Sequence, residues 1–250
     1  MCGLMSSTGA PDGPPMRAGA AVIDVISGVY AAVGAMTALL ERQTSGKGQW
    51  VQISLLHSGF GLMDFQAARY LYDGTVPGRT GNDHPTSMPT SAYATKDGYI
   101  NIAAGGDKMW RALCRAISHP DVATDPDFLT DPDRARNRAK LNRLLGDCFR
   151  ERTTAEWLRV LGDMDVPAGP IYSMDHAFAD PQVAVAGIVA EVPGPDGETR
   201  RILGQVAQLS RTPARIEHLL EEKGASTDSI LAEIGYERAD IARLREQGVI

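Results

Sequence analysis

An apolar stretch from Val25 to Leu40 is the clearest periodic feature of the chain. Only Ser27, Tyr30 and Thr37 carry polar groups there, and glycines and alanines recur at spacings of three and four. A helix that is apolar nearly all round belongs in the interior of a protein, and its small residues allow another backbone to approach closely. The pattern therefore predicts a buried helix.

The residues that flank this stretch predict where the helix begins and ends. Asp24 stands at or just before the first turn, where a carboxylate can accept hydrogen bonds from free backbone N–H groups at the positive end of the dipole. Helix capping is the plain interpretation, and it is compatible with a functional one, because a carboxylate held there stays ionised and oriented. Gly46 and Gly48 end the helix. Alternation then predicts a strand over Gln49–Leu55, followed by a helix over His57–Tyr72.

The remainder of the chain alternates between loops and short elements. Frequent glycines and prolines from Asp73 to Pro89 predict a linker or an extended functional loop. Lys96-Asp97-Gly98 predicts the turn of a hairpin between strands over 91–95 and 99–103. The further elements that we expect are helices over 108–118, 125–130, 133–150 and 153–163, a strand over 166–171, a helix over 174–179, strands over 183–192 and 200–206, and helices over 226–233 and 237–246. Asp107, Thr153 or Thr154, and Thr227-Asp228 are the expected helix caps.

Composition narrows the class of protein. The chain has 250 residues, of which 43% are hydrophobic and 22% charged, as is ordinary for a soluble globular protein of one or two domains. The net charge of −6 argues against a nucleic-acid surface, which needs basic patches. The basic residues between Arg134 and Arg143 are spaced so that they spread around a helix, which favours a solvated face.

The cysteines, histidines and apolar runs indicate the compartment and exclude some sites. Cys2, Cys114 and Cys148 are odd in number and far apart, which fits reduced thiols in a cytoplasmic protein. Cys114 is expected in the core of its helix. The five histidines show no metal-ligand spacing, so no metal site is expected. The 25–40 helix is too short to span a membrane, and no signal peptide is indicated, so neither a membrane nor a nucleic acid is expected as a partner.

Seven motifs in a fixed order carry a family resemblance that covers essentially the whole chain. The central motif begins with Asp24 and Gly28, continues with Ala38-Leu39-Leu40-Glu41-Arg42, and ends in Thr-x-Gly-x-Gly-Gln-x-Val-x-x-Ser-Leu-Leu over 44–56. The other six lie at 3–9, 14–19, 81–85, 96–99, 166–170 and 234–236. None is specific alone, but together and in order they resemble the class III CoA-transferases. This CaiB/BaiF family includes formyl-CoA transferase and alpha-methylacyl-CoA racemase.

The resemblance implies an α/β fold with a particular division. Residues 1–75 would be the remainder of a large CoA-transferase domain, 76–180 a linker and a smaller α+β domain, and 181–250 a return segment to the large domain. The resemblance also implies a homodimer of interlocked chains. The chain looks like the C-terminal portion of such a protein, because members have a long N-terminal half with the first strands and most CoA contacts.

The resemblance also implies a reaction. Asp24 corresponds to the nucleophile of the transferase branch, which attacks an acyl-CoA thioester to give an anhydride and then an aspartyl-CoA thioester. A carboxylic acid acceptor reverses the cycle and leaves as its CoA ester. Such a carboxylate must be ionised, fixed in one rotamer and shielded from water. Coenzyme A would be part of the substrate, and no other cofactor is expected.

Four more residues are candidates for substrate binding. Formyl-CoA transferases carry a run of glycines after the linker. Gly105 and Gly106 are the nearest candidates here, although their place between a strand and a helix is explained equally well by backbone geometry. His84 and Tyr93 bracket the other loop that should face the substrate, and each also has a purely structural interpretation.

Two alternatives to the transferase stay open. An acyl-CoA racemase or epimerase needs a histidine upstream of the aspartate, and no histidine precedes Asp24 in this chain. The other alternative is a non-catalytic fragment, or one subunit of a split enzyme whose partner is an N-terminal polypeptide. Activity of the isolated chain is expected to be incomplete. Unpaired sheet edges and exposed apolar surface would make it poorly stable or prone to aggregate.

Overall fold

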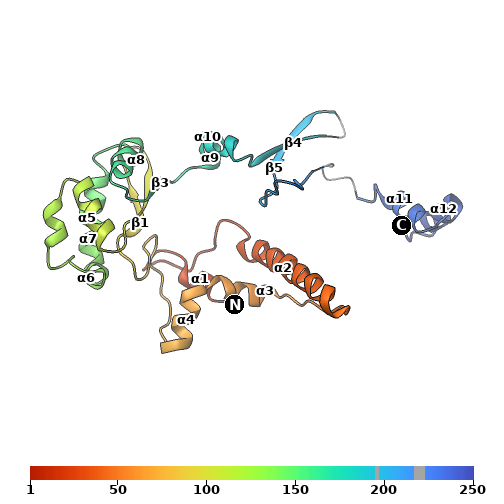
Figure 1. Ribbon diagram of the computed structural model, residues 1–250, viewed down its shortest axis with the longest axis horizontal. Helices are drawn as coiled ribbons and strands as arrows, with labels where there is room; N and C mark the ends of the chain where they lie inside the picture. Colours follow the sequence, from red (N-terminus) through yellow and green to blue (C-terminus); the bar gives the residue numbers. More distant parts are fainter. Residues whose placement is uncertain (195–196, 217–222) are drawn as a thin grey trace. The chain divides into compact units, whose positions relative to one another are not determined.

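The computed structural model describes residues 1–194, 197–216 and 223–250 (Figure 1). The chain divides into two compact units, Met1–Ile171 and Tyr172–Ile250, and each is described by itself. The division at 1–75, 76–180 and 181–250 and the interlocked dimer stay predictions.

The first unit begins with helices and ends with a small sheet among further helices. Its helices are α1 (Leu4–Ser7), α2 (Val22–Ser45), α3 (Leu55–Leu62), α4 (Asp64–Asp73), α5 (Asp107–Ala116), α6 (Asp131–Arg136), α7 (Arg138–Phe149) and α8 (Thr154–Asp163), with a 3₁₀ turn η1 (Pro120–Thr124). Its strands are β1 (Thr90–Ala94), β2 (Tyr99–Ala103) and β3 (Ala168–Pro170), which form an antiparallel sheet in that order. The predicted hairpin and the predicted short strand before residue 171 are confirmed.

Helix α2 is more exposed than the sequence analysis predicts. It contains no buried residue, and Val25 and Leu40 are 66% and 67% exposed. The expectation of a buried helix is therefore wrong for the described chain, in which α3 and the segment that follows α2 are the neighbours of this helix.

The full length of α2 also overturns the statement that no segment could span a membrane. With 24 residues, α2 is long and apolar enough to cross a bilayer by length and composition. The core helix of a soluble protein passes the same test, so this property does not itself place the chain in a membrane. The judgement about a membrane was wrong because it counted only the apolar stretch 25–40, whereas the whole helix runs from Val22 to Ser45 and ends at Gly46, as predicted.

The predicted strand over Gln49–Leu55 does not form, and the predicted helix after it is divided. Residues 46–54 have no regular secondary structure and no strand partner in the described chain, and a strand exists only where another strand pairs with it. The following helix is broken between α3 and α4, where Asp64 has a φ of 42°. Ser54 caps α3 by accepting a hydrogen bond from the His57 N–H.

The main core lies between the three-stranded sheet and the helices that follow it. Alternate positions of the two longer strands are buried, among them Tyr93, Ile100 and Ile102. Trp157 donates from Nε1 to the Phe149 carbonyl oxygen at 2.8 Å, and the two rings pack edge to face. Cys114 is fully buried in this core, as predicted.

Some of the helices in this core start where local signals predict, and others do not. The capping box of Thr153 and Glu156 at α8 is confirmed. Asp107 does not cap α5, because Gly106 occupies the cap position. The predicted helix over 125–130 is wrong, since the 3₁₀ turn η1 precedes it and α6 follows it.

Arg134 contradicts the prediction of a solvated basic face. Its side chain is 0% exposed and donates to the carbonyl oxygens of Met88 and Phe128 at 2.9 and 3.0 Å. It also pairs with Asp131 at 2.7 Å and with Asp107 at 3.3 Å. The spacing on the helix could not reveal that this one arginine points into the core.

The second unit contains α9 (Met174–Ala179), α10 (Pro181–Val185), the antiparallel pair β4 (Val189–Pro193) and β5 (Thr199–Leu203), α11 (Thr227–Glu233) and α12 (Arg238–Glu246). The predicted strand over 183–192 is wrong in its first half. Asp180 caps a helical turn there, and Pro181 occupies its first position. Thr227-Asp228 is the first turn of α11 rather than its cap, which is Ser226.

Candidate active site

Asp24 is the third residue of α2, not its cap. Ala21 holds the cap position, and Val22 and Ile23 precede Asp24 in the first turn. Its carboxylate is exposed and has no hydrogen bond or ion pair within the described residues. The capping interpretation is therefore wrong, while the favourable position in the field of the helix dipole remains.

Asp24 lines a small hollow together with a free cation. The hollow has a volume of about 150 Å³, and the loop before α2 and the start of α1 form its other walls. Arg17 lines it too, is exposed, and has no ion pair within the described residues. Pockets for drug-sized ligands measure roughly 300–1,000 Å³, so this hollow suits a small acid rather than a nucleotide.

The N-terminal loop connects this hollow with a second group of candidate residues. Leu4 lines the hollow. A few residues further on, Arg79 Nε donates to the Ala10 carbonyl oxygen at 3.3 Å, and the Gly81 N–H donates to the Gly9 carbonyl oxygen at 2.9 Å. Gly9 has a φ of 125°, and a Cβ there would lie 2.9 Å from the Pro14 carbonyl oxygen. The loop is thus tied to the start of the 81–85 motif.

His84 follows in that motif and is held on several sides. Its Nδ1 accepts from the backbone N–H groups of Ser87 at 3.0 Å and Thr86 at 3.3 Å. The ring stacks on Phe65 of α4 with a centroid separation of 5.5 Å and an interplanar angle of 20°. Its orientation is fixed by these contacts.

A chain of hydrogen bonds joins Tyr93 to the backbone of the same loop. The buried Tyr93 hydroxyl donates to Asn142 Oδ1 at 2.8 Å, and Asn142 Nδ2 donates to Asp83 Oδ2 at 2.8 Å. Arg138 donates to Asp83 and to the carbonyl oxygens of His84 and Pro85. Burial raises the pKa of Tyr93 well above its usual range. Tyr93 therefore helps to hold this loop in place through Asn142 and Asp83.

Gly105 and Gly106 lie between β2 and α5 and differ in their roles. A Cβ at Gly105 would collide with Ser87 Oγ, so Gly105 packs directly against the loop that carries His84. Gly106 has a φ of 79° and a ψ of 154° as it leads into α5, a conformation that glycine adopts without strain. His84, Tyr93 and Gly105 thus converge on residues 83–88, while the hollow that Asp24 lines includes none of them.

Three residues around the candidate site residues were not predicted from the sequence: Arg17, Arg138 and Asn142. Arg17 lies in a quoted motif, but nothing in a loop rich in glycine and proline indicates that it shares a hollow with Asp24. Arg138 and Asn142 are more than fifty residues from His84 and Asp83, so no local spacing could pair them.

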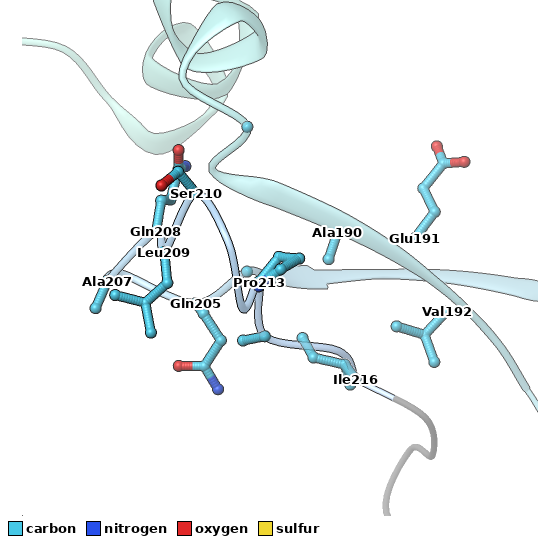
Figure 2. Close-up of a pocket in the computed structure, with 13 residues that line it drawn as sticks. Ala190, Glu191, Val192, Gln205, Ala207, Gln208, Leu209, Ser210, Pro213 and Ile216 are labelled. Carbon is cyan, nitrogen blue, oxygen red and sulfur yellow. The ribbon is translucent and has the colours of Figure 1, made fainter.

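A separate hollow of about 520 Å³ lies in the second unit, where Gly187, residues of β4 and the segment 204–216 line it (Figure 2). Among the described residues that line it, Glu191 alone has a charged side chain, and in the close-up this side chain points away from Gln205 and Leu209. None of the predicted site residues contributes to it.

Two of the three cysteines, Cys114 and Cys148, offer no reactive thiolate. Burial raises the pKa of Cys114 to about 12 and also raises that of Cys148. Both thiols are therefore protonated near neutral pH, and neither lines the hollow that contains Asp24.

The comparisons with known proteins identify the class. The chain matches the sequence profile of CoA-transferase family III over residues 1–219. It is 33% identical to human succinyl-CoA:glutarate CoA-transferase over 252 aligned residues, covering 99% of this chain and 57% of the relative. It is 32% identical to succinate–glutarate CoA-transferase of Agrobacterium fabrum, covering 94% of this chain and 58% of the relative. A crystal structure of a CaiB/BaiF family protein from Brucella suis matches with a TM-score of 0.76 at 31% identity, covering 93% of this chain and 60% of that one.

The chain therefore belongs to CoA-transferase family III, and its mixed α/β fold matches that of CaiB/BaiF proteins. It spans somewhat more than half the length of the relatives to which it is similar.

Proposed function

We propose that this chain carries the nucleophile of an enzyme that transfers CoA from an acyl-CoA donor to a carboxylic acid acceptor. The observation that carries the proposal is the Asp24 carboxylate, which is exposed, unengaged by the fold, and lines a hollow with Arg17. A carboxylate that forms no hydrogen bond or ion pair within the fold is free to act as a nucleophile.

Four transfers complete the reaction. An oxygen of Asp24 attacks the thioester carbonyl carbon, the C–S bond breaks, and CoA leaves as a thiolate. The thiolate attacks the Asp24 carbonyl carbon of the anhydride and releases the donor acid. The acceptor carboxylate then displaces the CoA thiolate from Asp24, and that thiolate attacks the acceptor's acyl carbon. Asp24 is regenerated, and no oxidant, metal or other cofactor enters the balance.

The substrates that we propose are short dicarboxylic acids and their CoA esters. Two relatives are named for succinate or succinyl-CoA and for glutarate, which supports this class. Arg17 supports it physically, because a guanidinium beside the reacting carboxylate can pair with the second carboxylate of such an acid.

Further parts of the site must come from outside this chain. Anhydrides survive only where water is excluded, and Asp24 is exposed here. We propose that a homodimer or an N-terminal partner polypeptide covers it, and that the assembly works in the cytoplasm without a nucleic acid or a membrane as partner.

A substitution tests the proposal. Asp24→Asn should abolish transfer of CoA from succinyl-CoA to labelled glutarate, because an amide cannot attack the thioester. Asp12→Asn, at another exposed aspartate of the same N-terminal region, is the matched control and should retain transfer. Transfer that survives Asp24→Asn would contradict the proposal. A gain of deuterium beside the acyl carbonyl without any acceptor acid would favour a racemase instead.

A further inference from the structure

The hydrogen bonds of His84 determine which ring nitrogen carries its proton. Backbone N–H groups are donors only, and two of them, from Ser87 and Thr86, reach Nδ1 at 3.0 and 3.3 Å. Nδ1 must therefore offer its lone pair to them. In the neutral imidazole the proton then resides on Nε2.

The loop that carries His84 is fixed in place by contacts with other parts of the first unit. Arg138 donates to the carbonyl oxygens of His84 and Pro85 at 3.1 and 2.9 Å, and Gly105 packs against Ser87. The stacked ring of Phe65 limits rotation about the side chain. Together, these contacts engage two carbonyl oxygens of the loop, one face of the imidazole ring and its Nδ1 atom.

The other ring nitrogen is left without a partner. No hydrogen bond engages Nε2 within the described residues, and among them the one buried polar side-chain atom without a partner is Trp110 Nε1. The Nε2–H group of the half-buried His84 therefore reaches the surface as a preorganised donor.

We propose that His84 donates from Nε2 to the carbonyl oxygen of the acyl-CoA thioester that Asp24 attacks. The identity of this substrate rests on the proposed function. Negative charge develops on that oxygen as the carboxylate adds, and a donor fixed in advance stabilises such charge without reorganisation. The N-terminal loop supports this pairing, because it lines the Asp24 hollow and is bonded to Arg79 and Gly81, just before His84.

Nitrogen-15 NMR of the full chain labelled at histidine tests the state of the ring without any turnover. In the neutral imidazole we expect Nδ1 of His84 to resonate as an unprotonated nitrogen and Nε2 as a protonated one. Titration with succinyl-CoA should shift the Nε2 resonance more than the Nδ1 resonance, whereas free CoA, which lacks the acyl oxygen, should leave Nε2 unchanged. A proton on Nδ1, or an Nε2 resonance that succinyl-CoA does not move, would overturn the proposal.

Two isosteric variants separate the donor role from a structural one. His84→Gln places an amide N–H near the Nε2 position, and His84→Asn places an amide oxygen near Nδ1, where it can still accept from Ser87 and Thr86. The donor role predicts that Gln keeps transfer within about tenfold of wild type, while Asn loses ~10²-fold or more in kcat with little change in thermal stability. A purely structural role predicts the reverse order. Failure of Asp24→Asn to abolish transfer would reject the proposed function, whereas the tautomer and the order of these variants test His84 alone.

Discussion

At the residue scale, Asp24 and Arg134 contrast in how the fold uses a charge. Asp24 is exposed and forms no bond within the described residues, whereas Arg134 is fully buried with five hydrogen bonds. The acceptors of Arg134 lie before β1, before α6 and at the starts of α5 and α6. This guanidinium thus connects segments that are distant in sequence.

We expect Arg134→Met to destabilise the fold by about 3 kcal/mol. The substitution leaves the carbonyl oxygens of Met88 and Phe128 without a donor in a buried place, and each unsatisfied group costs about 1–3 kcal/mol. Arg136→Met is the matched control, because that side chain is 70% exposed and forms one surface ion pair. Urea unfolding followed by circular dichroism measures both variants, and equal losses would contradict the assigned role of Arg134.

The sequence could name some site residues and not others for a physical reason. Asp24 and His84 belong to contiguous motifs, so their neighbours in the chain identify them. Arg138 acts through contacts with residues 53 to 55 positions away, and only the folded chain brings such groups together. The same holds for Arg134, whose helical spacing suggested a solvated residue.

At the scale of elements, the two glycines of α2 differ in how closely another segment approaches them. A Cβ at Gly34 would lie 2.7 Å from Val51 Cγ1, whereas a Cβ at Gly28 would meet nothing within 4 Å. The face of α2 that carries Gly34 is therefore in contact with the segment 46–54, whereas the position of Gly28 is open.

These two glycines form a matched pair. Gly28→Ala should raise the free energy of unfolding by about 0.5–1 kcal/mol, because alanine is the better helix former. Gly34→Ala should have a lower free energy of unfolding than wild type, because the added methyl group forces Val51 to move. Thermal and urea unfolding check the order of the two variants. Equal stabilisation by both would show that α2 does not pack on Val51.

The turn between β1 and β2 provides a prediction about pH. Hydrogen bonds from the Thr154 backbone N–H and hydroxyl, with another from Thr95, lower the pKa of Asp97 below its usual value. A carboxyl whose pKa is lower in the folded state adds stability above its unfolded pKa, and this contribution disappears as the pH falls through the folded value. We expect the difference in stability between wild type and Asp97→Asn to shrink from about pH 5 to about pH 2. A difference in stability that is constant over this pH range would contradict the assigned contribution of Asp97.

Elements with local signals were predictable, and elements that depend on distant partners were not. The Thr153 capping box and the Lys96-Asp97-Gly98 turn contain their own hydrogen-bond partners, and both are confirmed. Gln49–Leu55 alternates like a strand, but a strand also needs a neighbour with which to pair. The end of α2 was predictable from Gly46, whereas its exposure was not, because exposure depends on which other segments pack against the helix.

At the scale of the whole molecule, the segment before the main core contributes much of the exposed apolar surface. The core cluster extends from Met88 to Val166. Before it, large apolar side chains are open to solvent, among them Trp50 at 88%, Leu71 at 82% and Tyr72 at 94%. Apolar surface of this extent is typical of an interface.

We therefore expect the isolated chain to self-associate. Burial of apolar side chains between copies is favourable, so sedimentation velocity should show mass that rises with concentration. Leu71→Lys together with Tyr72→Lys should reduce the association without unfolding the core, because neither side chain belongs to it. A monomer that melts cooperatively at every concentration would contradict the prediction.

The family could be identified from the sequence because seven motifs keep their order along the chain. The arrangement of domains could not be predicted from local patterns, since it depends on contacts between segments and between chains. For the same reason, local patterns cannot predict which segment or chain excludes water from Asp24, as anhydride chemistry requires.

The role of Asp24 as the nucleophile is tested most directly by mass spectrometry of the chain after incubation with succinyl-CoA and digestion. We expect a CoA adduct, or a hydroxamate after treatment with hydroxylamine, on the peptide that contains Asp24, and no such adduct in Asp24→Asn. An adduct on another peptide, or an unmodified Asp24 peptide during measurable CoA transfer, would show that Asp24 is not the nucleophile.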